Sequence, residues 1–519
     1  MEKRFNLLDE PWVLVRKGVK TEKVSLVEVF KHAHEFDALA CELPTVDVAI
    51  LRLSLAVLYA VFSKVDVKGN LAEINNYDIA LSRWRSLWYM KKFPIDEIAD
   101  YLNHYKERFW LCHPEKPFFQ VAGLKTIDGR MNPIVQIIAD VPSRDERRFF
   151  TDMNGQEVHS LSFDEAARWL VHLQAWDYAG KKASVVGGTP NGGGTGWCGK
   201  LGIVYPQGRN LFETLLLNFV LTDSSGQCLS FSSPAWEQVA KTASKTDISP
   251  NGYVELLTWQ SRRTLLFVDG ARVTGVISSY GDVFAKENIS CEQMSGWHIS
   301  SLRNQGLIPN THDSSRSMWR DLGAILPRAI ADDKSRRPGV LDWIAQLGVQ
   351  DNVRLCAVGY EYGAMQGVVD RAIADSLSIN AALFAELGTD WVARIVDLLE
   401  KTDKSAYWLG VLASDLDKAA GGDGSKSGDA PKEHAYFALD EPFRTWLAEI
   451  DPAKSNMDLE SNKWKQEARR ILARQGDELV AEAGDAAFVG RDTKNGYLSA
   501  PKAEMKFKQR LNENLGGGG

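Results

Sequence analysis

A change in hydrophobic pattern near residue 370 constrains the fold of this 519-residue chain more than any other feature. Before it, short apolar segments alternate with glycine and proline, which is typical of short strands and helices. After it, apolar residues recur at intervals of three or four, which predicts amphipathic helices. Three groups follow this helical spacing: Leu383, Leu387, Trp391, Ile395 and Leu398; Phe443, Trp446, Leu447 and Ile450; and Trp464, Ala468, Ile471, Leu472, Gln475 and Leu479.

The pattern predicts an α+β protein of two domains. Residues 1–370 are expected to form a mixed domain of short antiparallel sheets and helices, and residues 371–515 an antiparallel helical bundle. The stretch Gly421–Pro431 is rich in glycine and is expected to be a flexible linker between helices. Residues 516–519 are expected to be a disordered tail.

Three segments of the N-terminal region have distinct patterns. The apolar stretch Thr45–Ser63 predicts a buried helix. Two apolar runs, Thr264–Val268 and Arg272–Ile277, flank Asp269-Gly270, and this arrangement predicts a β-hairpin because Asp-Gly favours the positive φ of a tight turn. By contrast, Gly180–Gly208 is rich in glycine and is expected to hold little regular structure.

Charge and composition limit the classes of protein to consider. The net charge is −7, whereas a protein held to nucleic acid by phosphate contacts is usually basic, so any such binding must use local patches or an assembly. The N-terminus has no apolar signal core and no stretch of 18 apolar residues occurs, so we expect a cytoplasmic protein without a membrane span. No two of the six cysteines form a C-x-x-C pair, so no zinc ribbon is expected.

The segment Gly194–Lys200 has the G-x-x-x-x-G-K spacing of a phosphate-binding loop. A working loop continues with serine or threonine, whose hydroxyl binds magnesium, and Leu201 cannot do this. A parallel α/β pattern around the motif is also missing. Because the spacing matches but these two features are missing, a P-loop-like NTPase is kept only as an alternative.

The same region offers a main chain with few side chains. Glycine lets the backbone approach a ligand closely and present bare N–H groups, so such a segment can enter a narrow groove. A surface loop without a ligand has the same composition, and both interpretations stay open. The glycines concerned are Gly187, Gly188, Gly192, Gly193, Gly194, Gly196, Gly199 and Gly202.

Basic clusters occur at Arg144, Arg147 and Arg148, at Arg262-Arg263 in the predicted strand region, and at Lys334, Arg336 and Arg337. Such side chains beside aromatic residues can clamp a backbone and stack a base, and ordinary surface charge is the alternative. The few histidines are not placed beside a nucleophile by any known motif, and no acidic cluster typical of a two-metal nuclease is present. We therefore expect no catalytic centre, no metal and no cofactor.

Four motifs along the chain resemble those of one family, in the same order. They are Phe5–Val13; His113–Gln120; Asn191–Gly194, with Gly208–Leu211 and Leu216–Asn218 after it; and Gly359-Tyr360, with Asp370-Arg371. Together they resemble the CasA family, the large subunit of the type I-E CRISPR Cascade surveillance complex.

The resemblance implies an α+β domain joined to a four-helix bundle, without enzymatic activity. It also implies recognition of the protospacer-adjacent motif of foreign double-stranded DNA from the minor groove, the start of duplex opening, and help in recruiting a helicase-nuclease. The implied partners include the guide RNA handle and other Cascade subunits, among them the small-subunit dimer. A helical scaffold subunit without DNA contact is the second alternative.

Site residues follow from the resemblance by position. The motif-reading residues would be Asn191, Gly192, Gly193 and Gly194, with Lys286 as a hairpin lysine. The wedge would consist of Gly363, Ala364, Met365 and Gln366, with Gln366 or Met365 at its tip. The guide-RNA contact would consist of Phe149, Phe150, Thr151 and Asp152, with Phe150 stacking. Some members carry a C-x-C-C cluster, and its absence here implies no zinc.

Overall fold

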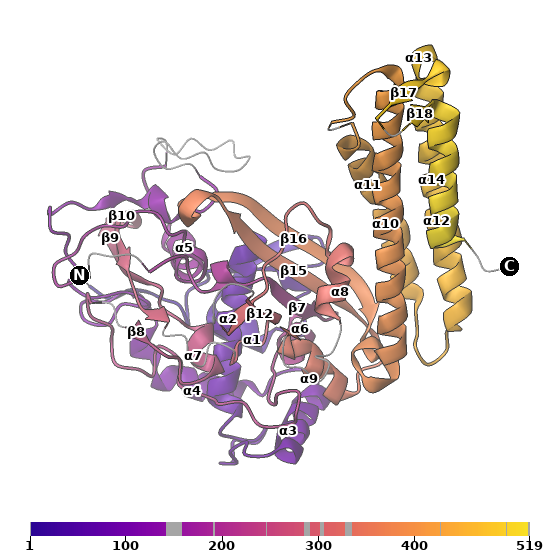
Figure 1. Ribbon diagram of the computed structural model, residues 1–519. Coiled ribbons are helices and arrows are strands. Elements are labelled where there is room, and N and C mark those ends of the chain that lie inside the picture. The colour runs from indigo at the N-terminus through magenta and orange to yellow at the C-terminus, as the bar shows by residue number, and fades with distance from the viewer. Residues whose placement is uncertain are drawn as a thin grey trace. The chain divides into compact units, whose positions relative to one another are not determined.

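The chain folds into two compact units (Figure 1). Unit 1 comprises Met1–Arg316, Arg328–Leu347 and Arg354–Ser376, and unit 2 comprises Ser317–Pro327, Gly348–Val353 and Leu377–Gly519. The computed structural model describes residues 2–141, 158–189, 193–244, 247–284, 291–300, 306–326, 335–425, 427–494 and 496–516.

Helix α2 (Pro44–Phe62) forms the centre of unit 1. Proline suits the start of a helix because its missing N–H has no intrahelical partner there, and the helix ends before Ser63, as predicted. By length and hydropathy α2 could cross a membrane, but 94% of its apolar window is buried within the fold, as in the core helix of a globular protein. Apolar residues lie on all of its faces, as expected for a helix that other elements surround, and Arg52 is a buried exception.

Helix α5 (Phe163–Trp176) packs against α2. A capping box fixes its start, because Glu165 N–H donates to Ser162 Oγ while Ser162 N–H donates to Glu165 Oε2 at 2.7 Å. A buried polar contact joins α5 to α2, where His172 Nε2 lies 3.1 Å from Thr45 Oγ1. The C-terminal end of α5 is therefore held at a defined place in unit 1.

The predicted hairpin is confirmed. Strands β9 (Arg262–Asp269) and β10 (Arg272–Tyr280) pair antiparallel, and Gly270 in the turn has φ +56°, which glycine adopts without strain. The prediction of little regular structure in Gly180–Gly208 is wrong at its end. Strand β7 (Ile203–Gln207) lies there and pairs with β15 (Asn352–Tyr362), because a short apolar run supplies a buried edge for the longer strand.

Short sheets and helices complete unit 1, as the α+β prediction requires. The sheets have the orders β3-β2-β4, β1-β5, β6-β10-β9, β11-β8, β13-β12-β14 and β16-β15-β7. The remaining strands are β1 (Arg4–Asn6), β2 (Val13–Lys17), β3 (Lys20–Val24), β4 (Ala38–Leu39), β5 (Trp110–Cys112), β6 (Asn132–Pro133), β8 (Asp247–Ile248), β11 (Val283–Phe284), β12 (Trp297–Ile299), β13 (Leu307–Pro309), β14 (Ser335–Arg336) and β16 (Val369–Asn380). The remaining helices are α1 (Leu26–Lys31), α3 (Tyr77–Met90), α4 (Ile95–His104), α6 (Leu211–Leu217), α7 (Tyr253–Leu257) and α9 (Gly339–Leu347).

Unit 2 is the predicted helical bundle. Aromatic side chains fill its core, where the rings of Phe443 and Trp464 meet edge to face at 4.9 Å and the Trp464 indole donates to Thr402 Oγ1 at 3.0 Å. Figure 1 shows the long helices side by side. They are α10 (Thr389–Ala420), α11 (Asp429–Glu449), α12 (Met457–Glu482) and α14 (Ala500–Leu515), and the shorter elements are α8 (Leu322–Ile325), α13 (Asp485–Val489), β17 (Arg491–Thr493) and β18 (Gly496–Leu498).

Some boundaries in unit 2 differ from the prediction. Leu383 and Leu387 lie in short 3-10 turns, and the long helix begins only at Thr389, because the chain folds back tightly enough that a Cβ at Gly388 would overlap the Leu383 backbone. The expected linker ends at Gly428, since α11 already includes Pro431. Of the expected tail, only Gly516 lies within the described residues.

A buried ion pair ties α2 to a distant loop of unit 1. The guanidinium of Arg52 donates to both carboxylate oxygens of Glu292, at 2.9 and 2.8 Å, and the indole N–H of Trp197 donates to the same carboxylate at 2.9 Å. Arg52 and Glu292 are almost fully buried. Neither charge is tolerated at this buried place without the other, so the pair holds α2 against the loop that carries Glu292. The bond from its indole holds Trp197 at the same carboxylate.

We expect Glu292→Gln to destabilise unit 1 by roughly 3–5 kcal/mol, because Arg52 would then carry an uncompensated buried charge while Trp197 keeps an acceptor. Urea unfolding followed by tryptophan fluorescence measures this change. The double variant Arg52→Met/Glu292→Gln should regain most of the loss. Equal stability of the single variant and the native chain would contradict the importance of the pair.

Candidate nucleic-acid interface

The described part of the glycine-rich region, Gly193–Gly202, is here called the glycine segment. It is held closely against the C-terminal end of α5. Gly196 N–H donates to the carbonyl of Asp177 at 2.7 Å, and a Cβ at Gly196 would overlap the backbone of Ala175. Gly194 has φ +72°, which side-chain-bearing residues rarely adopt. Glycine is therefore required at both positions by close approach and by backbone conformation.

Arg262, the first residue of β9, fastens this segment from inside the protein. Its side chain is 1% exposed and forms an ion pair with the carboxylate of Asp177. Its Nη2 also donates to the carbonyls of Tyr178 and Gly194, both at 2.9 Å. One guanidinium thus joins the end of α5 to the glycine segment.

Asp177 balances this buried charge. Burial alone would raise the pKa of its carboxyl group, but the charges of Lys182 and Arg262 outweigh burial and hold the pKa below its ordinary value. Lys182 Nζ lies 2.8 Å from Asp177 Oδ2. The carboxylate therefore stays ionised and keeps both cations in place.

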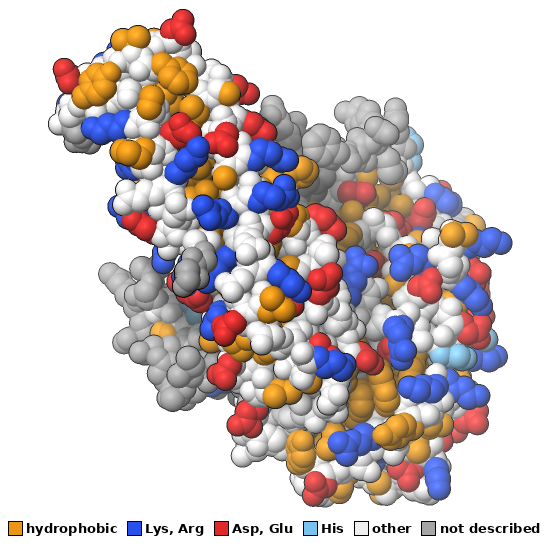
Figure 2. All heavy atoms as spheres, turned by 90° about the vertical axis from the view of Figure 1, so that its right-hand side faces the viewer, with side chains coloured by type: hydrophobic (Ala, Val, Ile, Leu, Met, Phe, Trp, Pro, Cys, Tyr) orange, Lys and Arg blue, Asp and Glu red, His pale blue; other side chains and the backbone are white. Residues whose placement is uncertain are grey.

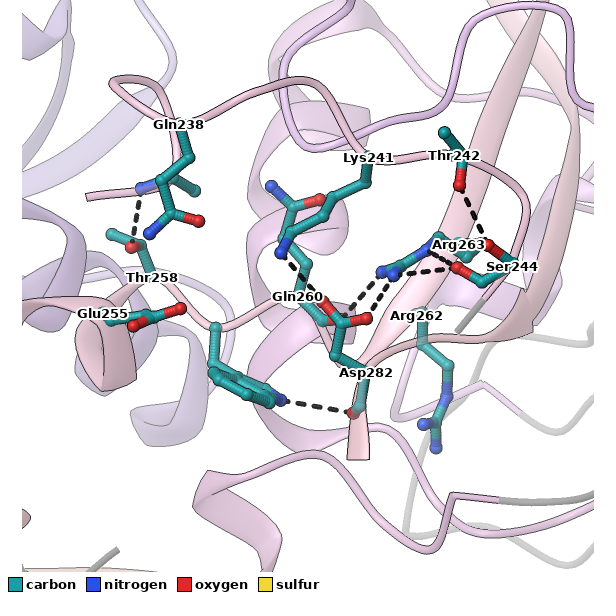
Figure 3. Close-up of polar contacts among 12 residues, drawn as sticks. Gln238, Lys241, Thr242, Ser244, Glu255, Thr258, Gln260, Arg262, Arg263 and Asp282 are labelled. Carbon is teal, nitrogen blue, oxygen red and sulfur yellow. Dashed lines mark hydrogen bonds and ion pairs between the residues drawn. The ribbon is translucent and has the colours of Figure 1, made fainter. Parts of the chain in front are cut away.

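The adjacent Arg263 fastens a second segment. It forms an ion pair with Asp282, whose carboxylate also lies 3.0 Å from Lys241 Nζ. Figure 3 shows Asp282 between Lys241 and Arg263, while Arg262 points away from this cluster. Burial would raise the pKa of Asp282, but the charges of Arg263 and Lys241 lower it. The chain is thus fixed immediately before β11, which leads toward Lys286.

Aromatic packing brings β11 beside the glycine segment. Phe284 stacks on Trp259 at 4.1 Å between ring centroids and lies 4.3 Å from Trp197. A Cβ at Gly193 would come within 3.0 Å of Val283 Cγ2. The start of the glycine segment and the last described residues before Lys286 are therefore neighbours in space.

The predicted wedge residues form the connection between β15 and β16, here called the wedge loop (Gly363–Gly367). Met365 is 95% exposed, and Met365 and Gln366 have φ of +54° and +55°, a left-handed conformation that is unfavourable for residues with side chains. Gln366 N–H donates to the carbonyl of Gly363 at 2.8 Å, which tightens the loop. Met365 is consequently held out from the sheet.

The wedge loop contacts the same end of α5 as the glycine segment. Ala179 N–H donates to the Gln366 carbonyl at 2.8 Å, and a Cβ at Gly180 would lie 3.2 Å from the Gly367 carbonyl oxygen. The residues Ala175–Gly180 are here called the bridge segment, because the glycine segment lies against one part of it and the wedge loop against another.

The structure brings together only some of the residues predicted for the interface. Gly194 is joined to the bridge segment through Arg262, and Gln366 accepts a hydrogen bond from it directly, so that the wedge residues Gly363, Ala364 and Met365 lie on the loop anchored there. Gly193 packs against Val283 of β11 instead. Asn191, Gly192, Lys286 and the predicted guide-RNA contact Phe149, Phe150, Thr151 and Asp152 lie outside the described residues.

The supporting residues were not predicted. The two interpretations of Arg262 and Arg263, a clamp on nucleic acid or ordinary surface charge, are both wrong because the two side chains are 1% exposed and paired inside the protein. The local sequence contains the arginines but gives no sign of their partners. Asp177 lies 85 residues from Arg262 along the chain.

A phosphate-binding loop does not fit this geometry. Residues Cys198–Lys200 form a single 3-10 turn in place of the first turn of a long helix, and Leu201 is buried. Lys200 Nζ lies 5.6 Å from the centre of the Phe284 ring. Burial, together with the charge of Arg262, lowers the pKa of Lys200. Within the described residues, no group of three or more His, Cys, Asp or Glu side chains is placed to hold a metal ion.

Surface charge is mixed on the face drawn in Figure 2, where lysine and arginine side chains are interspersed with aspartate and glutamate. This agrees with the net charge of −7. The geometry defines an α+β protein in which a glycine-rich main chain and a protruding loop are both anchored to the bridge segment, together with a helical bundle.

Comparison with known proteins identifies the family. A family model for the CRISPR-associated protein Cse1 matches residues 6–475. The chain is 34% identical to Cse1 of Thermobifida fusca, whose crystal structure matches with a TM-score of 0.84 over 99% of this chain and 98% of that one. It is 26% identical over 535 residues to CasA/Cse1 of Thermus thermophilus, over 98% of each chain.

A chain of a CRISPR RNA-guided surveillance complex has the same fold at 20% identity, with a TM-score of 0.71 over 99% of this chain and 100% of that one. This chain belongs to the Cse1 family, and the resemblance of its sequence to CasA is confirmed.

We expect Asp177→Asn to destabilise unit 1 by roughly 3–5 kcal/mol at neutral pH, because two buried cations lose their counter-charge. The folded protein lowers the pKa of Asp177, so the stability that the carboxylate adds over asparagine is fully present above the pKa of the unfolded chain, about 4. As pH falls below that value, the unfolded chain takes up the proton first, and the difference in free energy of unfolding between the native chain and Asp177→Asn decreases. Urea unfolding of both proteins between pH 7 and pH 3 measures the difference. A constant difference over this range would contradict the role of the Asp177 carboxylate.

Proposed function

We propose that this chain is the non-catalytic large subunit of a type I-E CRISPR effector complex, and that it recognises the protospacer-adjacent motif in foreign double-stranded DNA. The observation that carries the proposal is that Gly194 and the wedge loop are both anchored to the bridge segment, through Arg262 and through Ala179, while the strand leading to Lys286 packs beside Gly193 and Trp197. Membership of the Cse1 family and the fold shared with a chain of an RNA-guided surveillance complex support it.

The minor groove suits this arrangement. It is narrow, so a main chain without side chains can enter where larger residues clash, and its base edges distinguish mainly A·T from G·C. Asn191, Gly192, Gly193 and Gly194 would lie along the groove, with Lys286 beside them. Tolerant recognition of a short motif is the expected result.

The wedge loop would then start strand separation. An apolar side chain that enters a base step unstacks it, and Met365 is the large exposed apolar residue of this loop. Pairing of one strand with the guide RNA would supply the sequence specificity, as in other RNA-guided effectors. Phe150, with Phe149, Thr151 and Asp152, would contact the guide RNA handle.

Other Cascade subunits would complete the positive charge that a chain of net charge −7 lacks. In the proposal the helical bundle contacts the small-subunit dimer, and the assembled complex, in the cytoplasm, recruits a separate helicase-nuclease that cuts the DNA. The chain itself would need no cofactor or metal.

Replacing Gly193 by leucine should weaken capture of duplex DNA by the reconstituted complex about 10-fold, because the side chain would block close approach to the base edges. Titration of labelled duplexes with the correct and a scrambled flanking motif measures this loss. Gly484→Leu is the control for a leucine added outside the interface, since a Cβ there meets nothing within 4 Å, and urea unfolding of Gly193→Leu checks that contact with Val283 does not unfold unit 1. Unchanged capture by Gly193→Leu would favour a scaffold subunit without DNA contact.

Replacing Met365 by glycine should relieve the left-handed strain of the loop and leave the protein at least as stable, while removing the side chain proposed to enter the base stack. Opening of the duplex beside the flanking motif should slow, and binding to a target already opened there should persist. A base-analogue fluorophore beside the motif reports opening. Unchanged opening would remove Met365 from the wedge.

A further inference from the structure

Tyr362 lies where the glycine segment, the bridge segment and the wedge loop meet. It is the last residue of β15 and immediately precedes Gly363. Its hydroxyl donates to the carbonyl of Trp176 at 2.7 Å. From the other side, the backbone of Gly199 packs so closely that a Cβ there would overlap the Tyr362 hydroxyl.

This contact differs from ordinary core packing because it joins three separate parts of the chain through one polar atom. Trp176 ends α5 and precedes Asp177, whose carbonyl accepts from Gly196 N–H. The strand that carries Tyr362 continues directly into the wedge loop, which accepts a hydrogen bond from Ala179. A displacement of the glycine segment therefore acts on Tyr362 directly and through the bridge segment.

Electrostatics keep the hydroxyl in its donor form. Burial, followed by the neighbouring Tyr360 and Asp177, raises the pKa of Tyr362 well above the ordinary value of a tyrosine. The phenol thus stays protonated throughout the physiological pH range.

We propose that Tyr362 is a positioning residue that makes the glycine segment and the wedge loop move as one body, so that contact with a favourable flanking motif aims Met365 at the adjacent base step. This inference rests on the proposed function and adds to it the means by which motif reading is coupled to duplex opening. The coupling passes through packed and hydrogen-bonded groups that touch both loops.

The physical consequence is a difference between binding and opening. A wedge held rigidly relative to the bound motif loses little conformational freedom when it enters the stack. With the Tyr362 hydroxyl removed, both loops keep their bonds to the bridge segment, but they lose the contact that touches the bridge segment and the glycine segment at the base of the wedge loop, so the wedge is held less rigidly. Motif binding should then persist while the opening rate falls.

The direct test is Tyr362→Phe in the reconstituted complex, with the full chain and a duplex that carries a fluorescent base analogue beside the flanking motif. Loss of one hydrogen bond predicts opening about 5-fold slower at a favourable motif. Affinity for the same target with that base step already mismatched should change less than about 2-fold, since a single neutral hydrogen bond remote from the DNA is altered.

Tyr360→Phe is the matched control. It removes a buried hydroxyl from the same strand, two residues earlier, where it lies 2.9 Å from Thr45 Oγ1 and 3.2 Å from His172 Nε2. This control should lower general stability without changing the opening rate. Equal slowing by Tyr360→Phe and Tyr362→Phe would overturn the proposal in favour of a general loss of stability.

A double-mutant cycle tests coupling itself. With Tyr362 present, the effects of Gly193→Leu and Met365→Gly on the opening rate should be non-additive, because the two loops act as a unit. In the Tyr362→Phe background the two effects should come closer to additive. Additivity in both backgrounds would show that Tyr362 does not couple the loops.

Gly199→Ala approaches the same contact from the opposite side and serves if Tyr362→Phe does not assemble. The added Cβ would push the tyrosine ring away, so opening should slow as with Tyr362→Phe. A native opening rate in either variant overturns the proposal. If the unaltered complex shows no dependence of capture or opening on the flanking motif, the proposed function fails instead.

Discussion

Two successive arginines on β9 determine where the candidate interface lies. Neighbouring residues of a strand point to opposite faces, so Arg262 reaches Asp177 and the Gly194 carbonyl, whereas Arg263 reaches Asp282. Both guanidinium groups are buried, and a buried charge without its partner is strongly unfavourable. Each arginine therefore fixes the position of its partner carboxylate. A single strand thus holds the glycine segment on one side and the approach to Lys286 on the other.

Such supports are necessary because a glycine-rich chain cannot order itself. Glycine loses more conformational freedom on folding than other residues and supplies no side chain for packing. Here the order comes from neighbours that bind the main chain or a flanking side chain: Arg262 at the Gly194 carbonyl, Asp177 at Gly196 N–H and Glu292 at the Trp197 indole. The backbone is therefore already ordered before any ligand binds, which reduces the conformational entropy lost on binding.

Several arginines of this subunit cannot reach phosphates, although their buried pairs with carboxylates leave the net charge of −7 unchanged. Arg52, Arg262, Arg263 and Arg337 are buried and paired with carboxylates inside unit 1, so they count toward the formal charge without reaching the surface. Binding through backbone contacts in a minor groove, with partner subunits holding the phosphates, is consistent with this distribution. Contact through the main chain of the glycine segment therefore does not require the basic surface that this acidic chain lacks.

Local sequence patterns predicted the elements whose stability is itself local. The buried helix ending at Ser63, the hairpin around Gly270 and the long helices of unit 2 follow periodicity and turn chemistry, and the family resemblance follows from ordered motifs. Strand β7 was not predicted because it pairs with β15, whose residues lie about 150 positions away in the sequence. The four-helix bundle was expected, but the hydrophobic pattern located only three of its helices. Helix α14 was not located although Ala503, Phe507, Leu511 and Leu515 recur at four-residue intervals, since its other positions are strongly polar.

By itself, the sequence determined that a glycine-rich main chain lies between residues 187 and 202, where most of the long helices lie, and which family the motifs resemble. Tertiary structure alone decided that Arg262 and Arg263 are internal supports, that Tyr362 touches Gly199, and that the wedge loop shares the bridge segment with the glycine segment. The reason is physical. Periodicity and turn preferences act between near neighbours, whereas a buried charge or a close backbone contact is settled by whichever distant residue the fold brings to it.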